Sequence, residues 1–423
     1  MPVCLPMLRH LAVLFVLLAS LSGCTAVTQT MKATSSLMNF YGVVDMPMKE
    51  LEKRYLNEES EWIEIDGVRI HYRDQGEGPA IVLVHGVMSS LHTWDAWTEE
   101  LSKNFRVISL DVPGFGMTGG LPEDPLDLSP DGIHRMIAEY IPAIGNPGPS
   151  ARSVPKHTFS EETLLSLFSK FVDRLELDRF SIAGNSLGGY IGATYAAENP
   201  SRVEKLILLA PIGYPQDTPW IFDFATLPVI STIARYASPP LFVTLNVREV
   251  YGNPDRLSRA NLERYIHMSQ RAGAKSAYID TMLLLKARSD DVRPLPFHKI
   301  QAPTLLMWGE LDRWVPIELA ARWQNDIRNV QLITYPDAGH VPMEEIPEQT
   351  VADAILFLGE LQAPVPTSTV RERARSVDEL RSILEAPADT SSPQAQPSEP
   401  TTPQAAPEAS GDLLLEDMAP LEL

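Results

Sequence analysis

Four short runs of the sequence are almost entirely apolar, and helix-like segments separate them along the chain. The runs cover residues 80–84, 107–110, 206–209 and 304–308. Strands that are apolar on both faces are typical of a parallel sheet covered by helices on each side. The alternation of strand and helix patterns therefore predicts an α/β fold with a mostly parallel central sheet. Residues 61–72 alternate polar and apolar side chains around Asp66-Gly67, which predicts a hairpin at an antiparallel edge of that sheet.

The first 23 residues have the features of a signal peptide rather than of a folded element. Arg9 supplies a positive start, residues 11–19 form an apolar core, and Ser22-Gly23 places small residues directly before Cys24. The apolar core is too short to span a membrane comfortably. An ordinary signal peptide that happens to contain a cysteine is the alternative interpretation.

The sequence Leu21-Ser22-Gly23-Cys24 resembles the lipobox of bacterial lipoproteins. That resemblance implies cleavage before Cys24 and attachment of lipid to its sulfur. Thr25 stands where an aspartate would favour retention in the inner membrane, so the resemblance implies a lipid-anchored protein of the bacterial cell envelope, at the outer membrane. A membrane, reached through the lipid anchor, is therefore an expected partner. Cys4 lies in the removed segment, so the mature chain would hold no disulfide bond.

Composition divides the rest of the chain into parts. Residues 24–60 are expected to be an N-terminal tether, and residues 61–362 carry the alternating strand and helix patterns. Within that domain, residues 213–299 predict an inserted helical cap, and residues 121–157 form a proline-rich insertion. Residues 363–423 form an acidic, proline-rich tail that is expected to be disordered, because it has little apolar surface to bury. Nothing in the tail identifies a protein partner.

The charge of the chain excludes one class of partner. The formal net charge is −20 at pH 7, so the chain has no excess of Lys and Arg to neutralise phosphates, and we expect no binding to nucleic acid. This balance fits an extracytoplasmic protein that a lipid, rather than a basic patch, holds at a membrane. No clustered spacing of His, Cys and Asp indicates a metal site, and we expect no organic cofactor.

The motif with the clearest chemistry is Gly184-Asn185-Ser186-Leu187-Gly188, which lies between an apolar strand pattern and a helix pattern. A G-x-S-x-G turn of this kind aims a serine hydroxyl, and its two glycines avoid side-chain collisions. Serine is a poor nucleophile until a base removes its proton. Ser186 is therefore the candidate nucleophile, provided that the chain supplies the base and its partner.

Two downstream turns supply those partners. Asp312 follows the strand pattern at residues 304–308, and His340 stands in a Gly-His turn after another strand pattern. In the chemistry of a catalytic triad, His340 accepts the proton of Ser186, and Asp312 fixes the tautomer of the imidazole and stabilises its cation. Glu310 and Asp337 are the alternative acids, and a helix N-cap is the alternative role of Asp312.

The loop after the first buried strand is the expected position of a second oxyanion donor. It contains His85-Gly86-Val87, and the backbone N–H groups of Val87 and Leu187 are predicted to form the oxyanion hole. His85 is expected to brace the loop by hydrogen bonding rather than to catalyse. Asp111 is expected to stabilise the turn that it begins.

These motifs resemble those of the α/β-hydrolase superfamily over residues 61–362. The matching motifs are His85-Gly86, Asp111-Val112-Pro113-Gly114-Phe115-Gly116, Gly184-Asn185-Ser186-Leu187-Gly188-Gly189, Asp312 and Gly339-His340, with the Ser…Asp…His order of that fold. Residues 184–215 are similar to capped bacterial serine esterases and lipases of the monoacylglycerol-lipase-like kind. Haloalkane dehalogenases and epoxide hydrolases carry aspartate in place of Ser186, so this chain departs from them. Asn185 is similar to the hydrolases that cleave carbon–carbon bonds in ring-fission products.

The sequence thus predicts a lipid-anchored serine hydrolase that cleaves carboxylic esters through an acyl-enzyme. Small-molecule or lipid esters are the expected substrates, because the predicted cap contains side chains that suit an acyl or aromatic group. These side chains, which suit ordinary cap packing equally well, are Trp220, Phe222, Phe224, Leu227, Tyr236, Leu241 and Phe242. The alternatives are carbon–carbon bond or amide hydrolysis by the same fold, and a catalytically idle hydrolase fold that serves as a binding module.

Overall fold

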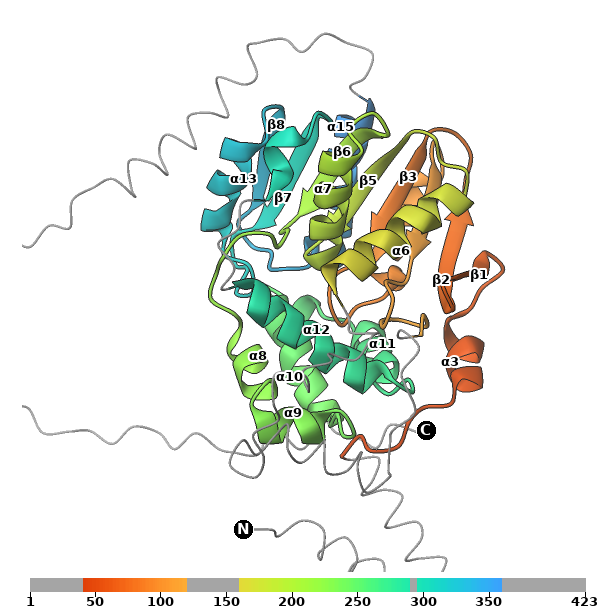
Figure 1. Cartoon of the computed structure of the whole chain (residues 1–423), viewed down its shortest axis with the longest axis vertical. Coiled ribbons are helices and arrows are strands. Elements are labelled where there is room, and N and C mark those ends of the chain that lie inside the picture. The colour runs from red at the N-terminus through yellow and green to blue at the C-terminus, as the bar shows by residue number, and fades with distance from the viewer. Residues whose placement is uncertain (1–40, 120–159, 290–294, 360–423) are drawn as a thin grey trace, which may run out of the picture. The chain divides into compact units, whose positions relative to one another are not determined.

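The computed structural model in Figure 1 describes residues 41–119, 160–289 and 295–359. Cys24 and the predicted signal peptide, the insertion at residues 121–157 and the tail at residues 363–423 lie outside the described residues. All of the described elements precede Ala363, where the chain divides into two units.

In the described part of the chain, eight strands form one sheet in the order β1-β2-β4-β3-β5-β6-β7-β8. The strands are β1 (Ser60–Ile65), β2 (Val68–Gln75), β3 (Ala80–Val84), β4 (Arg106–Leu110), β5 (Phe180–Asn185), β6 (Val203–Leu209), β7 (Thr304–Gly309) and β8 (Val330–Tyr335). β2 pairs antiparallel with both β1 and β4, and all the other neighbours are parallel. The predicted mostly parallel sheet with an antiparallel hairpin at its edge is therefore confirmed.

Helices cover both faces of this sheet. Figure 1 shows α6 (Glu161–Arg174), α7 (Leu187–Glu198) and α13 (Ala320–Asp326) in front of the sheet, and α15 (Pro347–Gly359) behind it. Behind the sheet, α4 (Asp95–Leu101) contacts α15. The first eleven residues of α7, residues 187–197, are buried. Its small residues let the helix lie close to β5, where a Cβ on Gly192 would come within 2.8 Å of Ile182.

Five α-helices among the described residues between β6 and β7 form the cap. They are α8 (Trp220–Ala225), α9 (Pro228–Ala234), α10 (Pro240–Val250), α11 (Arg259–Ser269) and α12 (Ala274–Ser289). Pro228 and Pro240 each occupy the first position of a helix, where a missing N–H costs no hydrogen bond. In Figure 1 these helices gather at one end of the sheet, below α7. Among the described residues, we find no helix with the combined length and apolar character needed to cross a membrane.

Residues 41–55, which the sequence analysis assigns to the tether, pack against the cap and end in helix α3 (Met48–Tyr55). We call them the N-terminal segment. Gly42 accepts a hydrogen bond from the Ser238 backbone at 3.2 Å, and Met46 donates one to Gln270 at 2.8 Å. Asp45 pairs with Lys275 at 2.5 Å. These contacts join residues far apart in sequence, so a local sequence pattern in the segment does not predict them.

Candidate active site

Ser186 lies at the sharp turn between β5 and α7. Its backbone has φ 55° and ψ −116°, a conformation that costs a residue with a side chain roughly 1–3 kcal/mol. A hydrogen bond from its N–H to the Leu209 carbonyl, 3.0 Å long, helps to hold the turn. A Cβ on Gly184 would lie 2.3 Å from the Gly188 oxygen, and one on Gly188 would lie 2.0 Å from the Val84 oxygen. The prediction that these two glycines avoid collisions is confirmed.

His340 and Asp312 form a hydrogen-bonded pair. The distance between His340 Nδ1 and Asp312 Oδ2 is 2.8 Å, and both side chains are buried. The other carboxylate oxygen of Asp312 accepts hydrogen bonds from the backbone of Trp314 and Val315 at 2.8 and 2.9 Å, which fixes the carboxylate. Because Nδ1 donates to Asp312, Nε2 is the nitrogen without a proton in the neutral imidazole. Nε2 is buried and has no hydrogen-bond partner in the described part of the chain.

The two alternative acids lie elsewhere. Glu310 is exposed and accepts a hydrogen bond from Thr334 at 2.7 Å. Asp337 is exposed and pairs with Arg256. Neither carboxylate is bonded to His340 in the described contacts, so Asp312 is the acid that the structure brings to the imidazole.

Three loops bring the candidate residues to one place. The side-chain amide of Asn185, next to Ser186, donates hydrogen bonds to the carbonyls of His340 at 3.0 Å and Leu209 at 3.1 Å. The loop after β3 passes close to the serine, since a Cβ on Gly86 would lie 3.0 Å from the Ser186 Cβ. Val87, Asn185 and His340 line the same pocket. Leu187 begins α7 and lines a neighbouring pocket. The oxyanion role of Val87 and Leu187 stays a prediction.

Glu345 is a site residue that sequence reasoning missed. Its buried carboxylate accepts hydrogen bonds from the backbone N–H groups of Gly339 at 2.8 Å, Gly252 at 2.9 Å and Asn253 at 2.7 Å. It therefore ties the residue before His340 to the chain that follows α10 of the cap. In the sequence, Glu344-Glu345 looks like an ordinary pair of charged surface residues. Only the folded structure shows which backbone N–H groups donate hydrogen bonds to Glu345.

Glu344 connects the cap to the same short helix, α14 (Pro342–Glu345). It pairs with Arg264 of α11 at 2.5 Å and accepts a hydrogen bond from the Tyr251 hydroxyl at 2.7 Å. Burial alone would lower the pKa of Arg264, but the Glu344 carboxylate holds that pKa above its ordinary value. The cap is thus joined to the His340 region by a buried ion pair as well as by Glu345.

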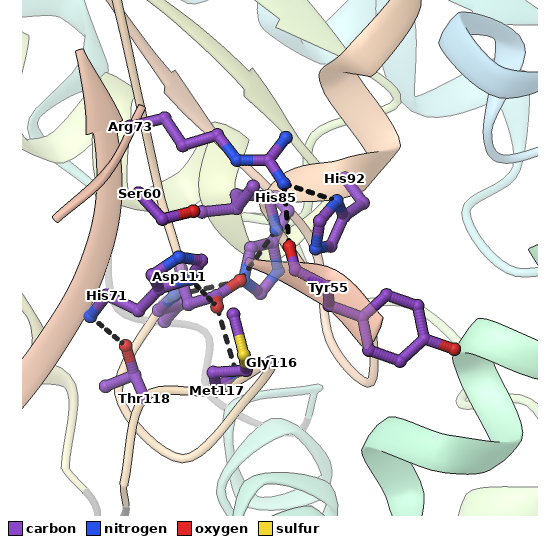
Figure 2. Close-up of polar contacts among 12 residues, drawn as sticks. Tyr55, Ser60, His71, Arg73, His85, His92, Asp111, Gly116, Met117 and Thr118 are labelled. Carbon is purple, nitrogen blue, oxygen red and sulfur yellow. Dashed lines mark hydrogen bonds and ion pairs between the residues drawn. The ribbon is translucent and has the colours of Figure 1, made fainter. Parts of the chain in front are cut away.

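Figure 2 shows the polar network behind the loop after β3. His85 Nδ1 donates to the Gly86 carbonyl at 2.6 Å, so its Nε2 is the acceptor for the Val112 N–H at 3.0 Å. Complete burial lowers the pKa of His85 and favours this neutral form. The expectation that His85 braces the loop is confirmed.

Asp111 occupies the centre of this network and is also completely buried (Figure 2). It accepts backbone hydrogen bonds from Leu91 at 2.7 Å and Met117 at 2.8 Å, and a third from His71 Nδ1 at 2.7 Å. Burial alone would raise the pKa of Asp111, but the hydrogen bond from His71 holds that pKa below its usual range. Asp111 stabilises its turn as expected, and it also fastens the loop after β3 to β2.

Two pockets meet at Trp314. The first, of about 480 Å³, lies at His340 and is lined from the cap by Val243, Asn246, Val247, Val250, Tyr265 and Tyr278. The second, of about 740 Å³, has mostly apolar walls that include Leu164, Leu187, Tyr190, Ile191, Phe222, Leu284 and Leu285. Polar side chains are also present in it, among them Glu161 and Arg288, which are 3.4 Å apart. Together the pockets could hold a substrate with an apolar part.

The predicted apolar side chains of the cap divide into two groups. Phe222 is buried and lines the larger pocket, and Phe242 is partly buried. The other five are exposed: Trp220, Phe224, Leu227, Tyr236 and Leu241. Most of the side chains expected to suit an acyl group are therefore exposed and do not line either pocket. Across the described ranges we find no group of three or more His, Cys, Asp or Glu side chains placed to hold a metal ion.

A family model described as alpha/beta hydrolase fold matches residues 79–347. The chain therefore belongs to the α/β-hydrolase family. Among its relatives is the pimeloyl-[acyl-carrier protein] methyl ester esterase of Nitrosomonas europaea, which is 27% identical over 290 residues, covering 67% of this chain and 97% of the relative. A second is the 2-hydroxy-6-oxo-2,4-heptadienoate hydrolase of Pseudomonas putida, 27% identical over 285 residues, covering 65% of this chain and 87% of the relative.

Solved structures show the same fold. One of them is the crystal structure of a membrane phospholipase A, a bacterial virulence factor, which superimposes with a TM-score of 0.56 at 23% identity. The match covers 84% of this chain and 99% of that one. At this identity the likeness concerns the fold alone.

Proposed function

We propose that the protein is a serine hydrolase that cleaves carboxylic esters, with Ser186 as nucleophile, His340 as base and Asp312 as its orienting acid. The observation that carries the proposal is the His340–Asp312 hydrogen bond of 2.8 Å, which leaves a buried, unpartnered Nε2 at the pocket beside the Ser186 turn. A base in this tautomer is what a serine hydroxyl requires. The esterase among the relatives supports the same assignment.

The reaction follows from the roles of these groups. Ser186 Oγ attacks the ester carbonyl while His340 Nε2 accepts the hydroxyl proton, and Asp312 stabilises the imidazolium. The N–H groups of Val87 and Leu187 receive the developing oxyanion, and the loss of one such donor costs about 3–4 kcal/mol. His340 then gives the proton to the leaving alcohol and activates a water that hydrolyses the acyl-enzyme. The chain's own side chains and backbone perform each of these steps.

Acyl esters, including lipid esters, are the substrates that we propose. The larger pocket has a mainly apolar wall beside Leu187, and burial of apolar surface contributes roughly 25 cal/mol per Å². An acyl chain placed there would have its carbonyl near the nucleophile turn. The esterase relative is named for the methyl ester of a pimeloyl-[acyl-carrier protein], which is an acyl ester.

Carbon–carbon bond hydrolysis is the second candidate, because one relative at the same identity carries the name of a dienoate hydrolase. Turnover of p-nitrophenyl esters of graded chain length, compared with turnover of ring-fission dienones, separates the two reactions. We expect ester hydrolysis to dominate and to rise with acyl length until the pocket is filled. Dienone cleavage with negligible ester turnover would reject the esterase proposal.

We also propose that the mature protein carries lipid on Cys24 and is held at the outer membrane of a bacterial cell envelope. The support is the lipobox-like sequence before Cys24. Cys24→Ser is expected to block lipid attachment to that residue, which metabolic labelling with a fatty acid and mass spectrometry of the N-terminal peptide would detect. Unchanged labelling of the Cys24→Ser protein would contradict this proposal.

A further inference from the structure

The exposed large hydrophobic side chains are concentrated on the cap. α8, α9 and α10, with the turns after α8 and α9, present seven of them, and α12 adds Leu283. The seven are Trp220, Phe224, Leu227, Ile233, Tyr236, Leu241 and Leu245. Outside the cap, the exposed large hydrophobic side chains of the described residues are Leu311, Leu356 and those of the N-terminal segment. Apolar side chains gathered on one part of a surface mark a contact site, whereas scattered ones do not.

The N-terminal segment extends this apolar area. Tyr41, Val43 and Val44 are exposed, and Gly42 between them is hydrogen-bonded to Ser238, two residues after Tyr236. We call this group of exposed side chains, from the N-terminal segment and α8–α10, the apolar cap face. Three of its four aromatic side chains, those of Tyr41, Trp220 and Tyr236, carry an N–H or O–H group, and such side chains suit the boundary between water and lipid because they have one apolar and one polar part.

The helices that carry this face also carry the pocket walls. On α10, Val243, Val247 and Val250 line the pocket at His340, whereas Leu241 and Leu245 are exposed. The two leucines are four positions apart and so lie on the same side of the helix. On α8, Phe222 lines the larger pocket while Trp220, 55% exposed, and Phe224 are outside. A membrane or protein that contacts the apolar cap face would therefore touch the same helices, α8 and α10, whose other side chains line the pockets of the proposed site.

We propose that the apolar cap face lies on a lipid bilayer, so that the cap meets the membrane directly and not only through an acyl anchor. Three observations favour lipid over a protein occupant. The face is rich in aromatic and aliphatic side chains, it joins the N-terminal segment, and that segment follows Cys24 closely in sequence. Even fully extended, the chain between Cys24 and Tyr41 reaches at most roughly 60 Å, so a lipid on Cys24 would hold Tyr41, at one end of this face, within that distance of the bilayer.

This placement gives the proposed hydrolase a source of substrate, and it rests on that proposed function only in naming lipid esters as what enters the pocket. Docking itself needs no catalysis. Because the chain carries a net charge of −20, the contact is expected to depend on apolar burial rather than on anionic lipid.

Binding to vesicles tests the proposal. The full chain carrying Cys24→Ser, which removes the proposed acylation site, is mixed with vesicles of phosphatidylcholine and phosphatidylethanolamine and floated on a density gradient. We expect the protein to float with the vesicles and the emission of Trp220 to shift to shorter wavelength, a shift that Trp220→Phe removes. We expect Leu245→Glu in the same background to weaken binding about tenfold, and Leu241→Glu/Leu245→Glu to weaken it further.

Leu356→Glu is the matched control, because Leu356 is 66% exposed on α15, behind the sheet (Figure 1). It is expected to bind vesicles like the parent. All variants should hydrolyse a short, soluble ester at the parent rate, which shows that they are folded.

Absence of vesicle binding by the parent, or equal binding by the Leu245→Glu and Leu356→Glu proteins, would overturn the proposal. So would a parent dimer in sedimentation that Leu245→Glu converts to monomer without change in vesicle binding, since the face would then join two copies. Vesicle binding that follows the prediction, without ester turnover, would reject the proposed function and leave this proposal standing.

Discussion

At the scale of single residues, the site depends on one tautomer. Asp312 is held by two backbone N–H groups, and its remaining oxygen receives Nδ1–H of His340. Nε2 therefore carries no proton and can accept one from the hydroxyl of a serine nucleophile. Ser186, Asp312 and His340 could be named from sequence because each stands in a turn directly after a strand pattern. Glu345 could not, because its partners at residues 252 and 253 come from a distant part of the chain.

Replacing Asp312 with Asn tests this residue-scale argument. The amide cannot fix the same imidazole tautomer, so we expect kcat for a short ester to fall about 10⁴-fold with little change in KM. Steady-state kinetics on the purified variant measures both constants. Glu310→Gln, at the exposed alternative acid, is the control and should behave like the parent. A large loss in Glu310→Gln with activity retained in Asp312→Asn would reverse the assignment.

At the level of secondary-structure elements, the strands of the central sheet could be predicted from the sequence, but the packing of the cap helices could not. Almost entirely apolar runs identify β3, β4, β6 and β7 because both faces of each strand are covered. The cap helices were expected from composition. Which of their side chains are exposed and which line the pockets depends on how each helix is rotated about its axis. Neither the Arg264–Glu344 ion pair nor the docking of the N-terminal segment has a local signature. Long-range polar contacts of this kind couple the cap to the His340 loop.

Glu345→Gln is expected to weaken that coupling. One carboxylate oxygen becomes an NH₂ group, which cannot accept the hydrogen bond from Asn253 if it replaces Oε1, or those from Gly339 and Gly252 if it replaces Oε2. We expect a loss of about 2–3 kcal/mol in the free energy of unfolding, measured by urea denaturation, and a lower kcat because His340 is less well placed. Glu348→Gln changes an exposed carboxylate a few residues away and should leave both quantities near the parent values. Equal effects of the two substitutions would contradict the role of Glu345.

At the scale of the whole molecule, buried histidines make stability depend on pH. Burial lowers the pKa of His85, of His92 and of His267 in the folded chain. Below the unfolded pKa of about 6.5, the unfolded chain therefore binds more protons at these positions than the folded chain does. The contribution of the neutral histidines is complete above that pH and is lost as pH falls toward their folded pKa values. Asp111 acts in the same direction at lower pH, below about 3.9, because its folded pKa is depressed.

We accordingly expect the free energy of unfolding to fall as pH is lowered from 7.5 to 5.5. Each histidine with a lowered pKa contributes at most about 1.4 kcal/mol per pH unit to this slope. Urea denaturation at several pH values measures the slope, and His85→Gln should make it shallower. A free energy that rises toward pH 5.5, or a slope that His85→Gln leaves unchanged, would show that His85 does not contribute in this way.

The proposed function requires Ser186 to be an activated nucleophile. The most direct measurement of this is labelling of the folded protein with a fluorophosphonate probe, followed by peptide mass spectrometry to locate the adduct. We predict one adduct, on Ser186, with no labelling of Ser186→Ala and greatly slowed labelling of Asp312→Asn. An unlabelled parent protein, as a catalytically idle binding module would be, or an adduct that persists in Ser186→Ala, would contradict the account.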